Sequence, residues 1–543
     1  MKAYLREKLT GSLGRLGLAG AVEVILEKPR LAEHGDLTTA VALSLAKRVG
    51  KNPRQLAQEI AAHLDVDRTF VDKVEIAGPG FINFHFTEKF YQQQLVETLV
   101  RGKESGRSEV GKRKKTQVEF VSANPTGPLT VGHGRNAVFG DTIANLLEWT
   151  NHDVSREYYF NNAGRQMRVL GDSVRLRYLE LLGEKVDFPE DYYQGAYIKD
   201  IAEHVMSDHG PSLRSEPAEG VFKQRAEQEI FGDIKKTLKR LGIEFDVFYN
   251  ENSLYEEGHV AEVVSGLRKR DLAYDKDGAV WFKASEFGSD KDKVIVKSSG
   301  EPTYRLPDIA YHREKFRRGF ELMIVVLGAD HIATYPDVLA GLSALGYDAE
   351  KVKVLIHQFV TIVQAGEVVK MSTRKANFIT LDELIDEVGA DVVRYFFLMR
   401  SIDSHLNFDL ELAKKQSDEN PVYYLQYAHA RIASIVRYAE AEGAITGDKP
   451  DVSLLVAGEE LALMKKLDEF PDVVESCAAA FEPHRLAEYL HEVAGLFHKF
   501  YHVHRVVTAD RNQTAARMAL CAATKTILAN GLAILGIAAP ERM

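Results

Sequence analysis

The chain has 543 residues, a length that excludes a single hydrophobic core and indicates three or four domains. Its 45% hydrophobic and 27% charged residues are typical of a soluble globular protein, and its net charge of −10 requires any nucleic-acid partner to meet local basic patches. The only two cysteines, Cys477 and Cys521, indicate a reduced cytoplasmic compartment and argue against a disulfide framework or a cysteine zinc site. Three basic runs are candidate patches: residues 112–115, 268–270 and 313–318.

Residues 1–105 are expected to form a small α/β domain. Leucines recur at helical spacing from Leu5 to Leu16, which predicts an amphipathic helix and not a signal peptide. Two short β-rich segments, 74–77 and 81–86, flank a Gly-Pro-Gly turn. The hydrophilic run 101–116 then predicts a linker.

Residues 118–147 predict a strand, a loop containing glycine and proline, and an apolar helix. A helix that begins directly after such a loop presents free backbone N–H groups and the positive end of its dipole. The expected guest is an anion such as a nucleotide phosphate. The alternative is an ordinary strand–turn–helix in which Gly132 and Gly134 only permit tight packing.

The loop sequence Asn124-Pro125-Thr126-Gly127-Pro128-Leu129-Thr130-Val131-Gly132-His133-Gly134-Arg135 resembles the HIGH signature of class I aminoacyl-tRNA synthetases, and its flanks resemble the arginine-specific branch. The family's first histidine is Thr130 here. A hydroxyl can donate a hydrogen bond to phosphate but carries no positive charge. The resemblance implies that His133 is catalytic and that ATP contacts Pro125, Thr126, Gly127, Pro128, Leu129, Thr130, Gly132, His133 and Gly134.

The same resemblance implies that the polar ends of the amino acid are held by Glu119, Ser122 and Asn124. Glu119 could equally be an outward-facing strand residue. Farther along, residues 195–202 and a helix at about 222–241 resemble the family's connective segment between the two halves of the nucleotide fold. The acidic, Gly- and Pro-containing stretch 208–220 predicts a loop.

A pocket for arginine needs carboxylates and an aromatic or hydrogen-bonding wall, because a guanidinium keeps its charge in water. Residues 303–311 resemble the family's arginine-binding stretch, in which Tyr304 would pack against the side chain and Asp308 would pair with the guanidinium. Alternatively, Pro307 starts a helix that Asp308 stabilises through the helix dipole, and both roles can coexist. His331 follows an apolar strand, at an edge where open α/β sheets bind ligands, and is a further candidate.

The segment Lys370-Met371-Ser372-Thr373-Arg374-Lys375 follows an expected strand at 352–363, interrupted by His357-Gln358, and resembles the KMSKS loop of the same family. Negative charge develops on the phosphoryl oxygens when a carboxylate attacks ATP, so a preorganised cation lowers the barrier. We therefore predict Lys370 as catalytic and Met371, Ser372 and Lys375 as ATP-binding. The segment alone could be a solvated basic loop, but two signatures in the family's order argue against coincidence.

From about Asp409 onward only helices are expected, and segments such as 423–432 and 482–490 resemble the α-bundle that reads the anticodon in this family. Their Tyr, His and Arg side chains suit base stacking, although a packed bundle would also use them internally. The apolar run 515–539 contains Arg517 and Lys525, so a buried bundle helix is favoured over a membrane span.

The predicted fold is therefore multidomain α/β: an N-terminal tRNA-recognition domain (1–105), a Rossmann-type class I catalytic domain with connective insertions (117–408) and an α-helical anticodon-binding domain (409–543). The resemblance implies that ATP, with Mg²⁺, activates L-arginine and that its tRNA receives it. It also implies a monomer. With the cysteine count and the composition above, we expect a cytoplasmic protein with no zinc, no tightly bound cofactor and no membrane partner. Two alternatives stay open: a nucleotidylyltransferase of the same fold, and a catalytically weak tRNA-binding paralogue, which Thr130 and Thr373 favour.

Overall fold

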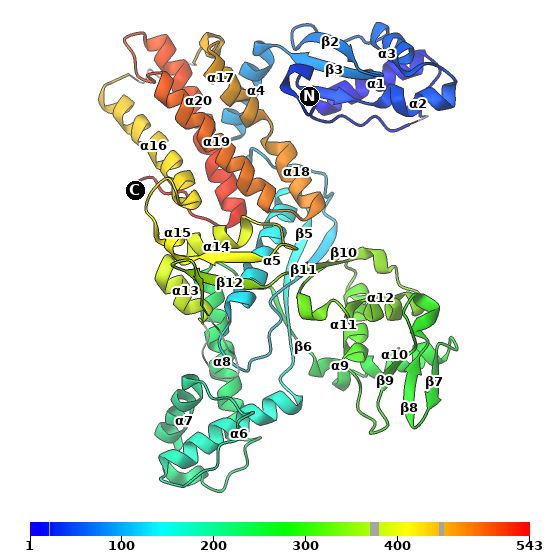
Figure 1. The fold of residues 1–543 in the computed structure, drawn as a ribbon, viewed down its shortest axis with the longest axis vertical. Coiled ribbons are helices and arrows are strands. Elements are labelled where there is room, and N and C mark those ends of the chain that lie inside the picture. The colour runs from blue at the N-terminus through cyan, green and yellow to red at the C-terminus, as the bar shows by residue number, and fades with distance from the viewer. Residues whose placement is uncertain (21, 370–378, 445–449) are drawn as a thin grey trace.

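The computed structural model describes residues 1–20, 22–369, 379–444 and 450–543. Figure 1 shows a central sheet region with a helical bundle and the N-terminal domain at one end of the molecule. Two insertions extend from the sheet region at the opposite end. The multidomain α/β architecture agrees with the sequence prediction.

The central sheet has five parallel strands in the order β11-β10-β4-β5-β6. The chain runs outward from β4 through β5 to β6 and returns on the other side of β4, so the strand order reverses between β4 and β10. Open parallel sheets bind ligands beyond the carboxyl ends of their strands at such a reversal. The strands are β4 (Lys115–Glu119), β5 (Asp153–Phe160), β6 (Val247–Asn250), β10 (Leu322–Gly328) and β11 (Val352–His357).

Helix α5 (Val131–Trp149) follows the signature loop and is buried along almost its whole length. A Cβ added at Gly140 would lie 2.3 Å from the Phe120 ring, and one at Gly134 would lie 2.5 Å from the Leu381 side chain. Gly134 is therefore needed for close packing, as the alternative interpretation of the loop assumed. That role is compatible with an anion site at the start of the helix.

The first insertion, between β5 and β6, is helical and coincides with the expected connective segment. It consists of α6 (Gly164–Leu181), α7 (Ala196–His209) and α8 (Val221–Arg240). The second insertion, between β6 and β10, has its own hydrophobic core. It contains α9 (Asn252–Glu256), α10 (His259–Arg268), the antiparallel strands β7 (Ala273–Lys276), β8 (Ala279–Phe282) and β9 (Lys293–Val296), and α11 (Arg305–Arg317). Helix α12 (Tyr335–Ala344) follows β10.

The strand predicted at 352–363, with an interruption at His357-Gln358, is two strands in the structure. It is divided into β11, in the central sheet, and β12 (Val360–Gln364), which pairs with β13 (Glu367–Val368) and β14 (Leu406–Asp409) in a separate sheet. Helices α13 (Leu381–Val388), α14 (Ala390–Leu398) and α15 (Leu410–Lys414) complete this unit. Because α15 packs against α13 and β12, the purely helical region begins at α16 (Pro421–Ala441) and not at Asp409.

The N-terminal domain pairs the sheet β1-β3-β2 with three helices, and its own core ends at Phe84. Its elements are α1 (Lys2–Arg15), β1 (Leu37–Thr39), α2 (Val41–Val49), α3 (Pro53–Ala62), β2 (Val71–Ala77) and β3 (Phe81–Phe86). The next helix, α4 (Glu88–Arg101), packs on α17 and α20, so the small domain is shorter than the predicted 1–105.

The C-terminal bundle consists of α16 and four further helices. They are α17 (Gly458–Asp468), α18 (Phe470–Ala480), α19 (His484–Val503) and α20 (Arg511–Leu535). Among the described helices, α20 alone is long and apolar enough by composition to cross a membrane, but 67% of its most apolar window is buried in the protein. Its apolar residues thus serve as bundle core, as predicted. Cys477 and Cys521 lie in α18 and α20 as free thiols, and burial raises the pKa of each to about 12.

Candidate active site

The chain leaves β4 in an unfavourable backbone conformation. Val121 and Ser122 have φ angles of +65° and +44°, a region that side-chain-bearing residues seldom adopt. Asn136 of α5 holds this segment in place. Its side chain accepts a hydrogen bond from the Val121 amide (2.6 Å) and donates one to the Val326 carbonyl of β10 (2.9 Å). Strain is therefore maintained at the strand reversal, where the fold predicts a ligand.

The strained segment orients Ser122 and Asn124. The Ser122 hydroxyl donates to Glu119 (3.1 Å) and accepts the Tyr159 amide of β5 (3.2 Å). The Asn124 side chain donates to Gln166 (2.9 Å) and accepts the Asn161 amide (2.9 Å). These predicted amino-acid-binding residues therefore lie between the carboxyl ends of β4 and β5.

The signature loop is clamped from two sides. The Tyr197 hydroxyl of α7 donates to the Thr126 carbonyl (2.8 Å), and a Cβ at Gly127 would lie 2.9 Å from that hydroxyl oxygen. On the other side, the Leu381 amide of α13 donates to the Leu129 carbonyl (2.8 Å). Pro125 is buried and Pro128 is half-buried in the same loop. The backbone that would cradle a phosphate is thus fixed before any ligand arrives.

Thr130 and His133 form a reciprocal cap at the start of α5. The Thr130 hydroxyl accepts the His133 amide (3.4 Å), and the His133 ring accepts the Thr130 amide at Nδ1 (3.1 Å). A ring nitrogen that accepts a backbone N–H cannot carry the proton, so Nε2 carries it. Burial lowers the pKa of His133, with Asp330 opposing that effect. His133 is therefore a neutral imidazole that offers an Nε2–H donor.

A second histidine near this cap was missed by the sequence analysis. His357 ends β11 beside Gly328 of β10, and burial lowers its pKa to about 4, with Arg135 and His133 acting in the same direction. The available signal was its position as a polar break in an otherwise apolar run. The predicted His331 lies in the short turn after β10, with 54% of its side chain exposed and its Nε2 3.6 Å from Asp330.

The second predicted signature, with Lys370, Met371, Ser372 and Lys375, lies outside the described residues. The chain that precedes and follows it is described. Thr380 forms a β-bridge with Thr130, and Arg135 of α5 donates to the carbonyls of Gln358, Ser401 and Ser404 at 2.8–2.9 Å. Helix α5 is thereby joined to the unit that carries the second signature.

Three carboxylates, those of Glu119, Glu251 and Asp308, lie near one another at the carboxyl ends of the sheet strands. Glu119 is 5% exposed and is paired with the fully buried Lys315 at 2.5 Å. Glu251 accepts hydrogen bonds from the Tyr159 hydroxyl (2.9 Å) and the Asn161 amide group (2.8 Å), and burial raises its pKa. Within the described chain no donor contacts the carboxylate of Asp308. Burial, and then repulsion from Glu251 and Glu119, raises the pKa of Asp308 to about 7.

Counting only the residues that the structure describes, this cluster has three carboxylates and one buried cation, Lys315. A cationic ligand placed between Asp308 and Glu251 would relieve the repulsion that raises the pKa of Asp308. Glu251 was not predicted from the sequence, since the short strand before it carries no distinctive pattern. Asp308 also lies in the first turn of α11, so both interpretations of this residue are structurally possible. Tyr304 precedes α11 with 90% of its surface exposed.

The basic run 313–318 is not a free surface for nucleic acid. Arg313 and Arg317 contact Glu262, and Arg318 forms two hydrogen bonds with the buried Glu157 at 2.6 and 2.8 Å. Lys315 is the buried partner of Glu119. The sequence could not reveal these acidic partners, because they come from β4, β5 and α10.

Three family sequence models match successive parts of the chain. They are described as arginyl tRNA synthetase N terminal domain (residues 3–86), tRNA synthetases class I (R), catalytic domain (94–395), and DALR anticodon binding domain (425–543). The first match ends where the structure ends the small domain.

Whole-length relatives are also found. The chain is 54% identical to the arginine–tRNA ligase of Desulfotalea psychrophila over 96% of this chain and 95% of that one. It is 50% identical to the arginine–tRNA ligase of Salinibacter ruber over the full length of both. The solved arginyl-tRNA synthetase of Thermus thermophilus superposes over 100% of both chains with a TM-score of 0.78 at 23% identity, which shows a shared fold.

Proposed function

The chain belongs to the arginyl-tRNA synthetase family, and from this membership we propose that it attaches L-arginine to the 3′-terminal adenosine of its tRNA at the expense of ATP. The arginine carboxylate attacks the α-phosphorus of ATP, the bond to pyrophosphate breaks, and arginyl-adenylate forms. A ribose hydroxyl of the tRNA then attacks the activated carbonyl, and AMP leaves. No step requires a covalent enzyme intermediate.

The observation that carries this proposal is the pair of carboxylates, Asp308 and Glu251, for which the described residues supply no cation in contact. A guanidinium is planar and permanently charged, and it presents N–H donors along more than one edge, so it can bond two carboxylates at once. We assign Asp308 and Glu251 to that group and retain Tyr304 as a wall of the pocket. We assign Ser122 and Asn124 to the polar end of arginine. Glu119 belongs to the same site as the ion-pair partner of Lys315.

For ATP, we assign the phosphate contacts to the start of α5. The first amides of a helix have no partner within it, so Val131 and Gly132 can donate to a phosphate beside the neutral Nε2–H of His133. Because His133 is uncharged, positive charge for the departing pyrophosphate has to come from elsewhere. We assign that role to Lys370 and to the Mg²⁺ that accompanies ATP as its substrate complex.

The remaining elements of the proposal concern partners. We infer that the α16–α20 bundle receives the anticodon end of the tRNA and that the N-terminal domain contacts the tRNA body, as the matched domain descriptions suggest. We further propose a monomer that works in the cytoplasm. His331, which follows β10, stays a candidate for the arginine pocket, and we assign His357, which ends β11 near His133, to the nucleotide side of the site.

Pyrophosphate exchange tests the proposal directly. Purified protein is supplied with ATP and with arginine, lysine or citrulline, each with and without tRNA. We expect exchange with arginine only, because citrulline has the shape without the charge and lysine has the charge without the fork. A nucleotidylyltransferase would show no dependence on arginine, and a silent paralogue would bind tRNA without exchange.

A further inference from the structure

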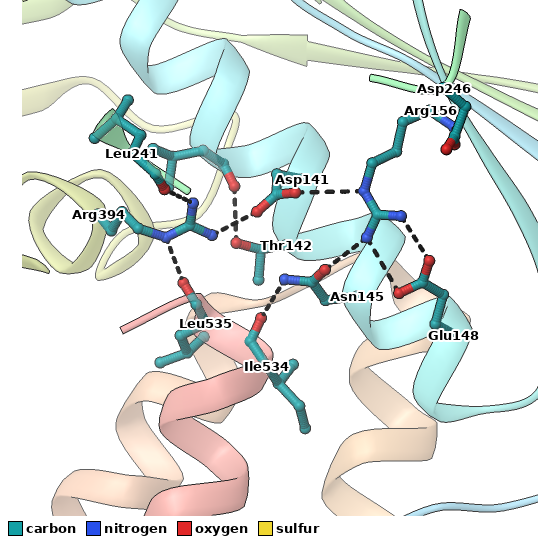
Figure 2. Close-up of polar contacts among 11 residues, drawn as sticks. Asp141, Thr142, Asn145, Glu148, Arg156, Leu241, Asp246, Arg394, Ile534 and Leu535 are labelled. Atoms are coloured by element: carbon teal, nitrogen blue, oxygen red, sulfur yellow. Dashed lines mark hydrogen bonds and ion pairs between the residues drawn. The ribbon is translucent and has the colours of Figure 1, made fainter. Parts of the chain in front are cut away.

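A buried polar network connects the middle of α5 to the last turn of the C-terminal bundle (Figure 2). Arg394 of α14 is 1% exposed, and its guanidinium donates to three separate parts of the chain. It bonds the Leu241 carbonyl after α8 (2.8 Å), the Leu535 carbonyl at the end of α20 (2.8 Å) and the Asp141 carboxylate of α5 (2.7 Å). One side chain thus joins the first insertion, the bundle and the helix that starts at the signature.

Asn145, one turn after Asp141, makes a second connection to the same helix end. Its amide group donates to the Ile534 carbonyl of α20 (2.9 Å) and its oxygen accepts from Arg156 of β5 (2.7 Å). Arg156 also contacts the other oxygen of Asp141 at 3.4 Å. Both carboxylate oxygens of Asp141 are therefore held by arginines (Figure 2).

The end of α20 is shaped to accept this arrangement. Terminal helix carbonyls lack intrahelical partners and carry partial negative charge, which favours a buried guanidinium. Gly536, with φ +69°, caps the helix, and a Cβ there would lie 2.2 Å from the Arg394 guanidinium carbon. Only glycine satisfies both the backbone angle and the space that Arg394 occupies.

The geometry makes the start of α5 sensitive to this contact. Asp141 and His133 are eight positions apart on one helix, a span of about 12 Å at the usual helical rise. A tilt of about 5° at Asp141 would therefore displace His133 by about 1 Å, a misplacement that can cost on the order of a hundredfold in rate.

We propose that Arg394 is a positioning residue that fixes the signature helix against the last turn of the C-terminal bundle, so that adenylate formation depends on the correct seating of that bundle. Arg394 acts through Asp141, and Asn145 supplies a parallel connection. The inference rests on the proposed function for the identity of the reaction, whereas the contacts that carry it do not depend on that function. It assigns the bundle a part in the chemistry that is separate from any binding of tRNA.

The test compares variants on and off this connection. Asn145→Ala removes the bond to α20, and Arg394→Lys retains the buried charge but cannot reach all three acceptors. The matched control is Asn530→Ala, because Asn530 of α20 also donates across the bundle interface, to the carbonyls of Gly102 and Ser105 at 3.1 and 2.9 Å, without reaching α5. For each variant, kcat and KM in pyrophosphate exchange, the Kd for tRNA and the Tm are measured.

We expect Asn145→Ala and Arg394→Lys to lower kcat about tenfold or more, with KM for ATP and Kd for tRNA within about threefold of the parent. The control, Asn530→Ala, should keep kcat within about twofold of the parent, even if its Tm falls as far as the Tm of the test variants. Equal losses of kcat in control and test variants, or full kcat in both test variants, would overturn the inference.

A second readout does not depend on the proposed reaction. Hydrogen exchange of the hydrogen-bonded backbone amides at 134–136 should accelerate in Arg394→Lys and stay at the parental rate in Asn530→Ala. Unchanged exchange in both variants would refute the positioning role, even if the protein proved to activate a different substrate. Failure of the parent to exchange pyrophosphate with arginine would refute the proposed function and leave this result standing.

Discussion

Replacing Asp308 by asparagine is expected to stabilise the protein while removing its use of arginine. Burial, with repulsion from Glu251 and Glu119, raises the pKa of Asp308 from its ordinary 3.8 to about 7. At 1.36 kcal/mol per pKa unit, a charged Asp308 lowers the free energy of unfolding by up to ~4 kcal/mol. Asparagine keeps the shape of the side chain and removes this cost.

The sign of the pH dependence follows from the direction of the shift. Below the unfolded pKa both states are protonated and Asp308 costs nothing. As pH rises through the interval from 3.8 to about 7, the unfolded state loses the proton first, and stability falls. Above that interval the loss is complete. The advantage of Asp308→Asn over the parent should therefore be about 2 kcal/mol at pH 5 and ~4 kcal/mol at pH 8.

Urea denaturation at the two pH values measures this difference. The control is Asp337→Asn in α12, because Asp337 is buried but paired with Arg305 at 2.6 Å, so its loss should destabilise the fold. In parallel, pyrophosphate exchange with arginine should fall at least about a hundredfold in Asp308→Asn with little change in the KM for ATP. The charge-repulsion argument would be refuted if Asp308→Asn were less stable than the parent at pH 8. It would also be refuted if the difference in free energy of unfolding between the two were the same at both pH values.

Three further changes test other parts of the site. Glu251→Gln should raise the KM for arginine about tenfold or more and leave ATP binding unchanged, because one of two charges facing the guanidinium is lost; an unaltered KM would exclude Glu251 from the pocket. Lys370→Ala should lower adenylate formation on the order of a hundredfold with nearly normal arginine binding, and a loss confined to arginine affinity would count against it. Thr130→Val should cost the cap roughly 1 kcal/mol and reduce exchange about threefold to tenfold, with a much larger loss in His133→Ala; equal, severe losses would contradict this ranking.

Local patterns in the sequence predicted individual strands and helices, but not which distant elements pack together. The strand, loop and helix at 118–147 were found because strand and helix periodicity change at Pro125 and Gly127. The interruption of 352–363 at His357-Gln358 was predicted, but the entry of its two apolar parts into different sheets was not, because sheet membership is not a local pattern. The sequence likewise did not show that α4 packs on the C-terminal bundle, because an amphipathic pattern does not reveal which domain a helix packs against.

The candidate site likewise contains residues that the sequence predicted and residues that only the fold revealed. Residues of the signature are neighbours in sequence, so family resemblance could identify them together. Glu251 comes from the end of a strand and Lys315 from the last turn of α11, and only the fold brings them to Glu119 and Asp308. The capping role of Thr130 was also missed, since Ser or Thr before a helix predicts a cap only where the helix start is already known.

The carboxylate cluster also accounts for how arginine could be distinguished from lysine. Lys315 neutralises Glu119, which leaves Asp308 and Glu251 as two separate acceptors for one side chain. A guanidinium can donate to both along separate edges, whereas an ammonium is a compact point charge that pairs with one carboxylate and leaves the other without a cationic partner. Sites that must leave a buried polar group unpaired reject the wrong substrate by roughly 10⁴-fold or more. If Asp308 and Glu251 receive the guanidinium as proposed, a ligand that bonds both carboxylates relieves their mutual repulsion, and a ligand that bonds only one does not.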